Sequence, residues 1–534
     1  MKYAKRVAIS LVCSLIATSP LAQDTHDHAA HPATQLTEEN IGVARFETSC
    51  AAEVTETFNR AVSLLHSFWF PEARAAFERV LSTDPQCAIA YWGIALTHWG
   101  NPFAGLRSQQ LIALGQAALE KGMRTGQPTE RERAYLAAVA RLFASADPST
   151  QRARILEYEA AMEALAAAYP NDVEARIFWA LAISQAAEPE DKTFVRQLKA
   201  GAILEPLFER MPKHPGLAHY IIHAYDVPPL AERALPAARA YADIAPAVPH
   251  ALHMPSHTFT RVGMWRESVA TNRRSAETAE RTKEPGAVLH ALDYMAYAYL
   301  QMGMDAEAKE VVERANRLVS TGANPFALAA IPARYALERR QWKDAANLSI
   351  PGFSAPPYVE AMTRFARAVG AARSGNPQAA APEIDRLQAL RDRALAMQDA
   401  YWAEIIDIQR RGAIAWVQFA EGKIPEALET MRAAADAEDA TEKSAITPGP
   451  LAPAREMLGF MLFESGRFEE ALAAFDSTIA KEPNRFLALY GAGRTAERLL
   501  RTDLARKYYR QIAAICADAS GDRPELAHAR RMAT

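Results

Sequence analysis

The chain has 534 residues, of which 50% are hydrophobic and 23% are charged, with 24 glycines and 32 prolines. This composition excludes a disordered or collagen-like polymer, because such chains carry far less apolar surface or far more glycine. Lysine and arginine number 60 against 63 acidic residues, a net charge of −3. No basic tract appears, so we expect no nucleic-acid partner and look instead to small molecules, metals or proteins.

The first residues predict a secretory signal peptide over residues 1–22. Lys2, Lys5 and Arg6 precede a short apolar run, and small residues follow as far as Ala22. The run is too short to span a bilayer, and no later stretch approaches about 18 consecutive apolar residues, so no transmembrane segment is expected. Cleavage near Ala22 shifts the net charge from −3 to −6. We therefore expect a periplasmic or secreted protein.

Residues 23–48 are predicted to form a flexible, histidine-containing segment. His26, His28 and His31 lie in its polar first part. Short histidine tracts of this kind capture copper or zinc ions, although a solvated linker explains the same composition. Both interpretations stay open.

Three cysteines follow the predicted signal peptide. Cys50 and Cys87 lie 37 residues apart, each just ahead of a helical segment. In an oxidising compartment they are able to form a disulfide, and two small buried residues are the alternative. Cys516 lies in an apolar helical segment, so we expect it in the core.

The rest of the sequence predicts helices throughout. Apolar residues recur at intervals of three and four, and the alternation typical of strands is missing. A repeat of about 34 residues, with small residues and a terminal proline at fixed places, predicts helical hairpins. The clearest copy spans residues 452–485, with Gly459, Gly466, Phe475 and Pro483 at those places. Weaker copies start near Val173, Pro215, Pro249, Leu289, Phe326, Ala361 and Ile408.

This pattern resembles the tetratricopeptide repeat superfamily. The resemblance implies an all-α, helical-hairpin solenoid with a right-handed superhelix, and protein or peptide binding in its concave groove. We expect a superhelix over residues 49–440, C-terminal repeats over 450–518 and a tail over 519–534. Five motifs also resemble a group of exported bacterial tetratricopeptide proteins of unassigned biochemical role. They are LLHSFWFPEARAAFE from Leu64, CAIAYWGIA from Cys87, HYIIHAYD from His219, HALHMPSHTFTRVGMW from His250 and TPGPLAPARE from Thr447.

The histidines are unevenly distributed. Five of the 13 fall within 39 residues, between His219 and His257. Repeats that start at Pro215, Pro249 and Leu289 place these residues on three neighbouring first helices, which line the groove in the resembled family. The predicted wall lies within residues 215–300. It carries His219, His223, Asp226, His250, His253, His257, His290 and Asp293.

Imidazoles and carboxylates on one helical face are the arrangement that offers two ligands to one metal ion. Nitrogen and oxygen donors favour Zn²⁺, and Fe, Mn or Cu fit the same set. Eight candidates exceed one tetrahedral site, so either two ions bind or some residues orient the ligands. Asp226 and Asp293 suit the orienting role. An interhelical hydrogen-bond network is the non-functional alternative.

Four further residues are predicted to complete a ligand site. Arg261, Tyr294 and Tyr297 lie one turn from wall residues and offer guanidinium and phenol groups to an anionic ligand. Glu456 reaches the histidine wall only if the superhelix closes on itself, so that its two ends enclose one interior. By contrast, we expect His214, which lies beside a proline in a loop, to be exposed to solvent.

These features predict an exported scaffold that binds a divalent metal, together with a ligand or protein partner, in its groove. Two alternatives stay open. The same wall serves equally as the active centre of a metalloenzyme of hydrolase or oxidoreductase type. A generic tetratricopeptide adaptor for protein partners is the other.

Overall fold

The computed structural model describes residues 36–353 and 355–533, and these residues form helices joined by turns and loops. The first third contains α1 (Glu38–Ile41), α2 (Thr55–His66), α3 (Phe70–Thr83), α4 (Ala90–Trp99), α5 (Gln109–Arg124), α6 (Glu130–Leu142), α7 (Gln151–Ala168), α8 (Val173–Gln185) and α9 (Val195–Arg210). The middle contains α10 (Pro215–Ala224), α11 (Leu235–Ile244), α12 (Pro249–His253), α13 (Pro255–Arg261), α14 (Trp265–Arg281), α15 (Pro285–Gln301), α16 (Asp305–Arg317), α17 (Pro325–Glu338) and α18 (Trp342–Ala346). The last third contains α19 (Pro357–Arg373), α20 (Ala381–Ala396), α21 (Ala400–Ala420), α22 (Ile424–Ala440), α23 (Ala454–Glu464), α24 (Phe468–Lys481), α25 (Phe486–Arg498), α26 (Thr502–Ile515) and α27 (Pro524–Met532).

Each helix packs mainly against its neighbours in sequence, as expected for stacked hairpins. The predicted all-α helical-hairpin solenoid is therefore confirmed. The predicted repeat starts at Val173, Pro215 and Pro249 coincide with the first residues of α8, α10 and α12. The later first helices begin earlier than predicted: α15 begins at Pro285 and α21 at Ala400. No helix in the described part of the chain is long and apolar enough to cross a membrane.

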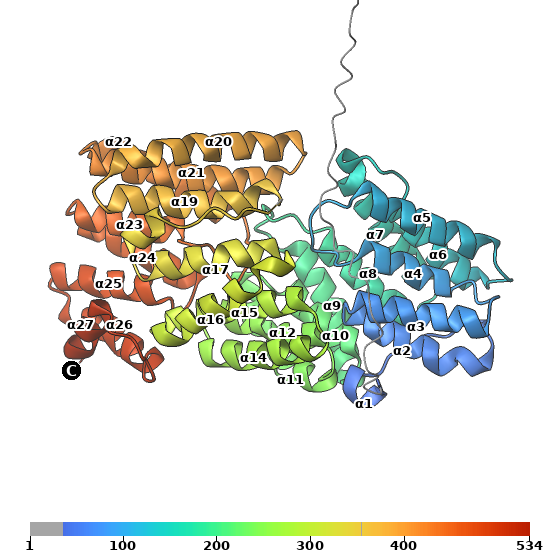
Figure 1. Cartoon of the computed structure of the whole chain (residues 1–534). Helices are drawn as coiled ribbons and strands as arrows, with labels where there is room; N and C mark the ends of the chain where they lie inside the picture. Colours follow the sequence, from blue (N-terminus) through green and yellow to red (C-terminus); the bar gives the residue numbers. More distant parts are fainter. Residues whose placement is uncertain (1–35, 354, 534) are drawn as a thin grey trace, which may run out of the picture.

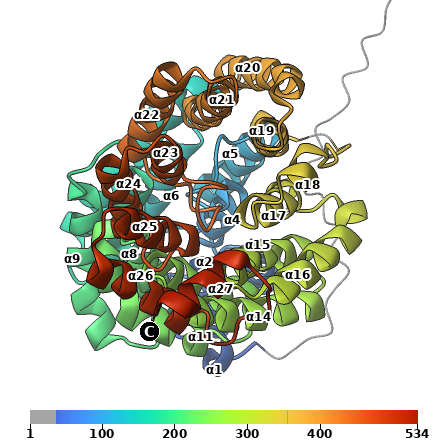
Figure 2. The ribbon, with the colours of Figure 1, turned by 90° about the vertical axis from the view of Figure 1, so that its left-hand side faces the viewer.

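The solenoid closes on itself (Figures 1 and 2). In Figure 2 the helices surround a central region, and the loop between α22 and α23 lies inside the ring. The C-terminal repeats return to α14–α16, about 200 residues earlier in the chain. Trp265 Nε1 donates to the carbonyl of Asn484 at 3.0 Å, and Arg523 Nε is 3.0 Å from both carboxylate oxygens of Asp305.

Residues 36–48 are packed rather than flexible, which corrects the prediction for that part of segment 23–48. Ile41, Ala44 and Phe46 are buried, and the ring of Phe46 lies 5.1 Å from that of Trp92. Burial of these apolar side chains outweighs the cost of ordering the segment. The predicted signal peptide, together with His26, His28 and His31, lies outside the described residues.

The C-terminal tail predicted over residues 519–534 also contains packed structure. Residues 524–532 form α27, and Leu526 and Ala529 are buried against the last hairpin.

The structure also places the three cysteines that follow the predicted signal peptide. Cys50 and Cys87 form a disulfide with a Cα–Cα distance of 4.8 Å, and Cys516 is buried as predicted.

His214 is buried, which corrects its predicted exposure. Its Nε2 lies 3.0 Å from Glu174, and His66 Nε2 lies 2.8 Å from the other oxygen of the same carboxylate. His214 is buried although it lies in a loop, because the Glu174 carboxylate provides one hydrogen-bond acceptor to His214 and another to His66. Burial alone raises the pKa of Glu174, but the imidazoles of His214 and His66 outweigh that effect and hold it well below its usual range.

Gly263→Ala tests the closure of the solenoid. Gly263 has φ +69°, and a Cβ there would lie 2.4 Å from the carbonyl oxygen of Pro483 in the facing repeat. The left-handed backbone costs alanine about 1–2 kcal/mol, and overpacking adds about 1–3 kcal/mol. Gly466→Ala is the matched control, because Gly466 has φ +77° with no heavy atom within 4 Å of the added Cβ. In urea denaturation we expect the larger loss at Gly263, and equal losses would contradict the closure contact.

Glu174→Gln tests the buried carboxylate. A depressed pKa in the folded state stabilises the fold above the unfolded pKa of about 4.3, and this contribution is lost as pH falls through the lower folded pKa. At pH 7 we expect the variant to lose about 3–5 kcal/mol of unfolding free energy, because two buried imidazoles lose their partner. The difference between wild type and variant should shrink as the pH is lowered from 5 to 3. A difference that does not depend on pH over this range would contradict the assignment.

Candidate metal centre

Three neighbouring first helices present six histidines to one region of the lumen. α10 carries His219 and His223, α15 carries His290, and the helix between them is broken into α12 and α13. Pro255 causes this break, since it lacks the backbone N–H that an uninterrupted helix needs. His253 and His257 lie on either side of the break.

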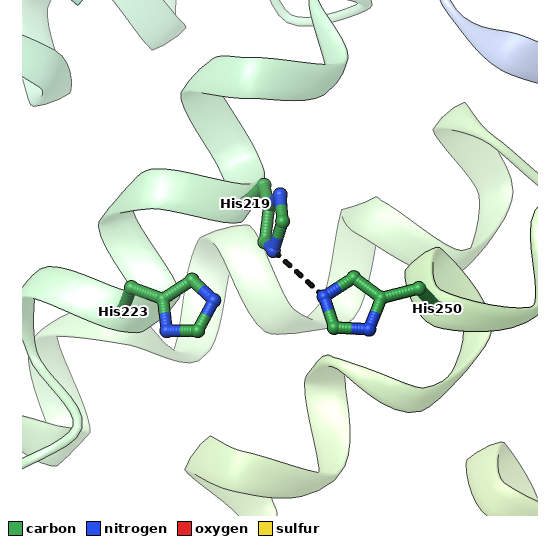
Figure 3. A group of neighbouring side chains, drawn as sticks. All are labelled: His219, His223 and His250. Atoms are coloured by element: carbon green, nitrogen blue, oxygen red, sulfur yellow. Dashed lines mark hydrogen bonds between the residues drawn. The ribbon is translucent and has the colours of Figure 1, made fainter. Parts of the chain in front are cut away.

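The first triad consists of His219, His223 and His250 (Figure 3). One ring nitrogen of each residue lies within 4.8 Å of the others, and the Nε2 atoms of His219 and His250 are 3.2 Å apart. His219 Nδ1 lies 2.6 Å from the backbone carbonyl of His66, so it carries the proton and Nε2 presents its lone pair. The buried Nε2 of His223 has no hydrogen-bond partner among the described residues.

The second triad consists of His253, His257 and His290, again with one ring nitrogen of each within 4.8 Å of the others. In this triad the Nε2 atoms of His253 and His257 are 3.1 Å apart. His253 and His257 are 2% exposed, whereas His250 and His290 are the half-buried members of the two triads. His250 and His290 are therefore the members through which solvent reaches each triad.

The tautomers of the second triad follow from its hydrogen bonds. His253 Nδ1 lies 2.7 Å from Asn272 Oδ1, and the Asn272 amide is oriented by its own donation to the carbonyl of Ser268 at 2.8 Å. His257 Nδ1 lies 2.9 Å from a carboxylate oxygen of Asp226. Both acceptors require a proton on Nδ1, so both Nε2 atoms present lone pairs to each other. Two lone pairs at 3.1 Å repel unless a cation lies between them.

Burial disfavours a proton as that cation, because a protonated imidazole is charged. It lowers the pKa of His253 well below its usual range, and the neighbouring imidazoles of His290, His257 and His250 lower it further. Burial also lowers the pKa of His257, although the Asp226 carboxylate opposes this shift. The pKa of His290 falls to about 3. Neutral imidazoles are the form that binds metal ions.

Asp226 lies at the junction of the second triad and the lumen. Besides His257, its carboxylate accepts from Arg261 Nε at 2.8 Å and from Lys443 Nζ at 3.3 Å. Burial raises the pKa of Asp226, but Lys443 and Arg261 outweigh it and hold that pKa well below its usual range. The ionised carboxylate fixes the His257 tautomer, as carboxylates behind metal-bound histidines do.

The loop at residues 441–453, which we call the strap, covers the centre from inside the ring. Tyr294 OH donates to the carbonyl oxygens of Ala445 and Thr447, at 3.3 and 3.2 Å, and lies 3.4 Å from His257 Nε2. Lys443, which binds Asp226, belongs to the strap. This loop therefore forms one wall of the centre.

Three predicted site residues lie elsewhere. Asp293 faces Arg334, with 3.4 Å between Oδ1 and Nε, and belongs to neither triad. Tyr297 and Glu456 contact Arg485, at 3.1 Å for Tyr297 OH and at 2.7 and 3.0 Å for the two Glu456 oxygens. These three residues are therefore held by Arg334 and Arg485 rather than by the histidines. The other two predicted ligand residues lie beside the second triad: Arg261 binds Asp226, and Tyr294 OH lies 3.4 Å from His257 Nε2.

Sequence reasoning missed the aromatic residues of the first triad. The Phe68 ring lies 4.3 Å from that of His219, and the Phe103 ring stacks on His223 at 4.1 Å. Phe68 has φ 54°, in the left-handed region, as do non-glycine residues at other turns such as Arg340 and Leu500, so its presence at this turn carries no separate sequence signal.

Comparison with protein families identifies tetratricopeptide repeats in two parts of the chain. The tetratricopeptide repeat family model matches residues 70–102 and 461–520. No curated protein matches the chain significantly. Among solved structures, a chain of the APC/C hetero-tetramer Cut9–Hcn1 is 11% identical with a TM-score of 0.38, covering 92% of this chain and 78% of that one. A monomeric IFIT1 mutant with Gppp-AAAA is 12% identical with a TM-score of 0.38, covering 91% of this chain and 95% of that one.

These TM-scores are too low to carry an argument about function. The family match, by contrast, falls on α3–α4 and on α23–α26, which form helical hairpins at both ends of the described chain. The chain thus contains tetratricopeptide-type repeats at residues 70–102 and 461–520, within a solenoid of stacked helical hairpins.

Proposed function

We propose that this protein is a tetratricopeptide scaffold whose lumen binds divalent metal ions at the two histidine triads. One observation carries the proposal: the Nε2 lone pairs of His253 and His257 face each other at 3.1 Å, with both Nδ1 atoms bound to acceptors. A metal ion placed between them removes the repulsion.

The residues fit a zinc-class ion. Tetrahedral zinc with bonds of about 2.0–2.1 Å to nitrogen separates its ligands by about 3.3 Å, close to the 3.1 and 3.2 Å Nε2 separations of the two triads. Asp226, Asn272 and the carbonyl of His66 hold three of the imidazoles in the binding tautomer. Three imidazoles per ion leave room for a further ligand. The metalloenzyme alternative requires such an open position and stays a prediction.

Tetratricopeptide repeats indicate a protein-interaction scaffold, and protein partners remain part of the proposal. We also propose that the protein is exported, which fits the predicted signal peptide. The disulfide between Cys50 and Cys87 supports this, because such bonds persist in oxidising compartments.

Metal analysis of the purified full chain tests the centre. We expect up to two equivalents of zinc-class metal per chain, and about one equivalent less in the double variant His253→Ala/His257→Ala, which removes two of the three second-triad ligands. His528→Ala is the control: this half-buried histidine on α27 lies 3.2 Å from Glu497, far from the triads in sequence and contacts. A metal-free protein whose thermal stability is unchanged by added zinc would refute the proposal.

Asp226→Asn tests the orienting carboxylate. An asparagine amide is able to donate to His257 Nδ1, which would move the imidazole proton to Nε2 and block the ligand atom. We expect zinc affinity to fall about 10–100-fold in competition with a chromogenic chelator. Asp293→Asn is the matched control, because Asp293 faces Arg334 instead, and its affinity should stay within about threefold. Equal effects at both positions would show that Asp226 has no special role.

A further inference from the structure

A pocket of about 90 Å³ lies beside the strap, which supplies part of its lining. Residues from α17, α19, α21 and α22 line it together with the strap, and most of its lining is apolar. The triad histidines are not among its lining residues. The pocket thus adjoins the centre described above through Arg261 and Lys443, but it does not include the histidines.

Aromatic side chains form one wall of this pocket. Tyr358 and Trp402 stack with ring centroids 4.0 Å apart, and Phe326 lies 5.9 Å from Trp402. Tyr358 and Trp402 are half-buried, so part of each ring faces the pocket. Aromatic faces attract organic cations as well as apolar groups, because the ring quadrupole is negative above its plane.

Glu438 supplies a carboxylate to the same pocket. One of its oxygens accepts from the backbone N–H of Ala454 at 2.7 Å, and among the described residues no basic side chain lies within ion-pair distance of it. Burial raises the pKa of Glu438 to about 7, with Lys481 opposing the shift and Glu482 and Asp439 adding to it. The Glu438 carboxylate therefore has no direct ion-pair partner among the described residues, although Lys481 lies near enough to act on its charge.

The basic side chains that line the pocket already have partners. Arg261 and Lys443 bind Asp226, while Arg334 donates to the carbonyl oxygens of Pro450 and Gly449 and lies beside Asp293. Lys481 donates to the carbonyl of Glu438. They are committed to other acceptors, so an added anion finds no unpaired cation among them. Thr441 adds a buried hydroxyl without a hydrogen-bond partner in the described structure.

We propose that this pocket binds a small organic ammonium ion with an aromatic or similar apolar body. The ammonium group pairs with Glu438, and the apolar body packs on Tyr358, Trp402 and Phe326. The basic side chains of the pocket are already bound to other acceptors, so an anion of the same shape would meet Glu438 and Glu482 without a free cation, and a neutral analogue would leave Glu438 without an ion-pair partner. The inference stands without the metal centre, since no triad residue takes part.

Calorimetric titration of the full chain with 2-phenylethylamine tests this. We expect one site per chain, with affinity at least tenfold higher than for 2-phenylethanol or phenylacetate, as charge-assisted hydrogen bonds predict. Equal affinity for the alcohol, tighter binding of phenylacetate, or no binding of the amine would overturn the proposal. This comparison requires no variant and no bound metal.

Two variants locate the site. Glu438→Gln keeps an oxygen for the Ala454 N–H, and it should weaken amine binding at least tenfold while leaving 2-phenylethanol within about threefold. Glu482→Gln is the matched control, because this pocket carboxylate already accepts from Tyr297 OH at 2.8 Å, and amine binding should change less than threefold. If Glu438→Gln folds poorly, Trp402→Leu replaces it and should lower amine affinity at least fivefold. Unchanged amine binding in folded Glu438→Gln or Trp402→Leu protein would place the amine elsewhere.

Discussion

The closure of the solenoid is the contact on which the interior depends. A helical-hairpin array of this length could remain an open superhelix, in which each repeat contacts only its neighbours. Here the turn at Gly263 meets Pro483 and Asn484, and Arg523 reaches Asp305. Closure converts a concave wall into a lumen. Only a lumen brings the strap at residues 441–453, from near the C-terminal repeats, against histidines more than 150 residues earlier.

The enclosed lumen determines the chemistry of the histidines. In water, neighbouring imidazoles relieve repulsion by taking up protons, but burial makes that costly. The structure places acceptors behind three of the six rings and leaves their Nε2 atoms facing inward. An interhelical hydrogen-bond network explains His219 and His250, since His250 is free to donate from Nε2. It does not explain His253 and His257, because neither has a proton to offer the other.

Much of this arrangement could be predicted from the sequence, because a repeat period places residues in space without a structure. The spacing of 34 between Pro215 and Pro249 put five of the six histidines on adjoining helices, and those helices begin at the two prolines. The errors concern tertiary partners. His214 is buried because Glu174, 40 residues away, binds it, and Asp293 turns to Arg334. Neither partner has a fixed offset in the repeat, so periodicity carried no information about them.

The strap limits what the inner surface is able to bind. Its backbone carbonyls already accept from Tyr294 and Arg334, and the Glu442 carbonyl accepts from Tyr401 at 3.1 Å. A peptide that took the place of the strap would have to replace these bonds, so ions and small molecules suit the remaining space better. Lys443 on the strap also binds Asp226, which orients His257. Because Lys443 also lines the pocket, a displacement of the strap would change the charge beside both the pocket and the second triad.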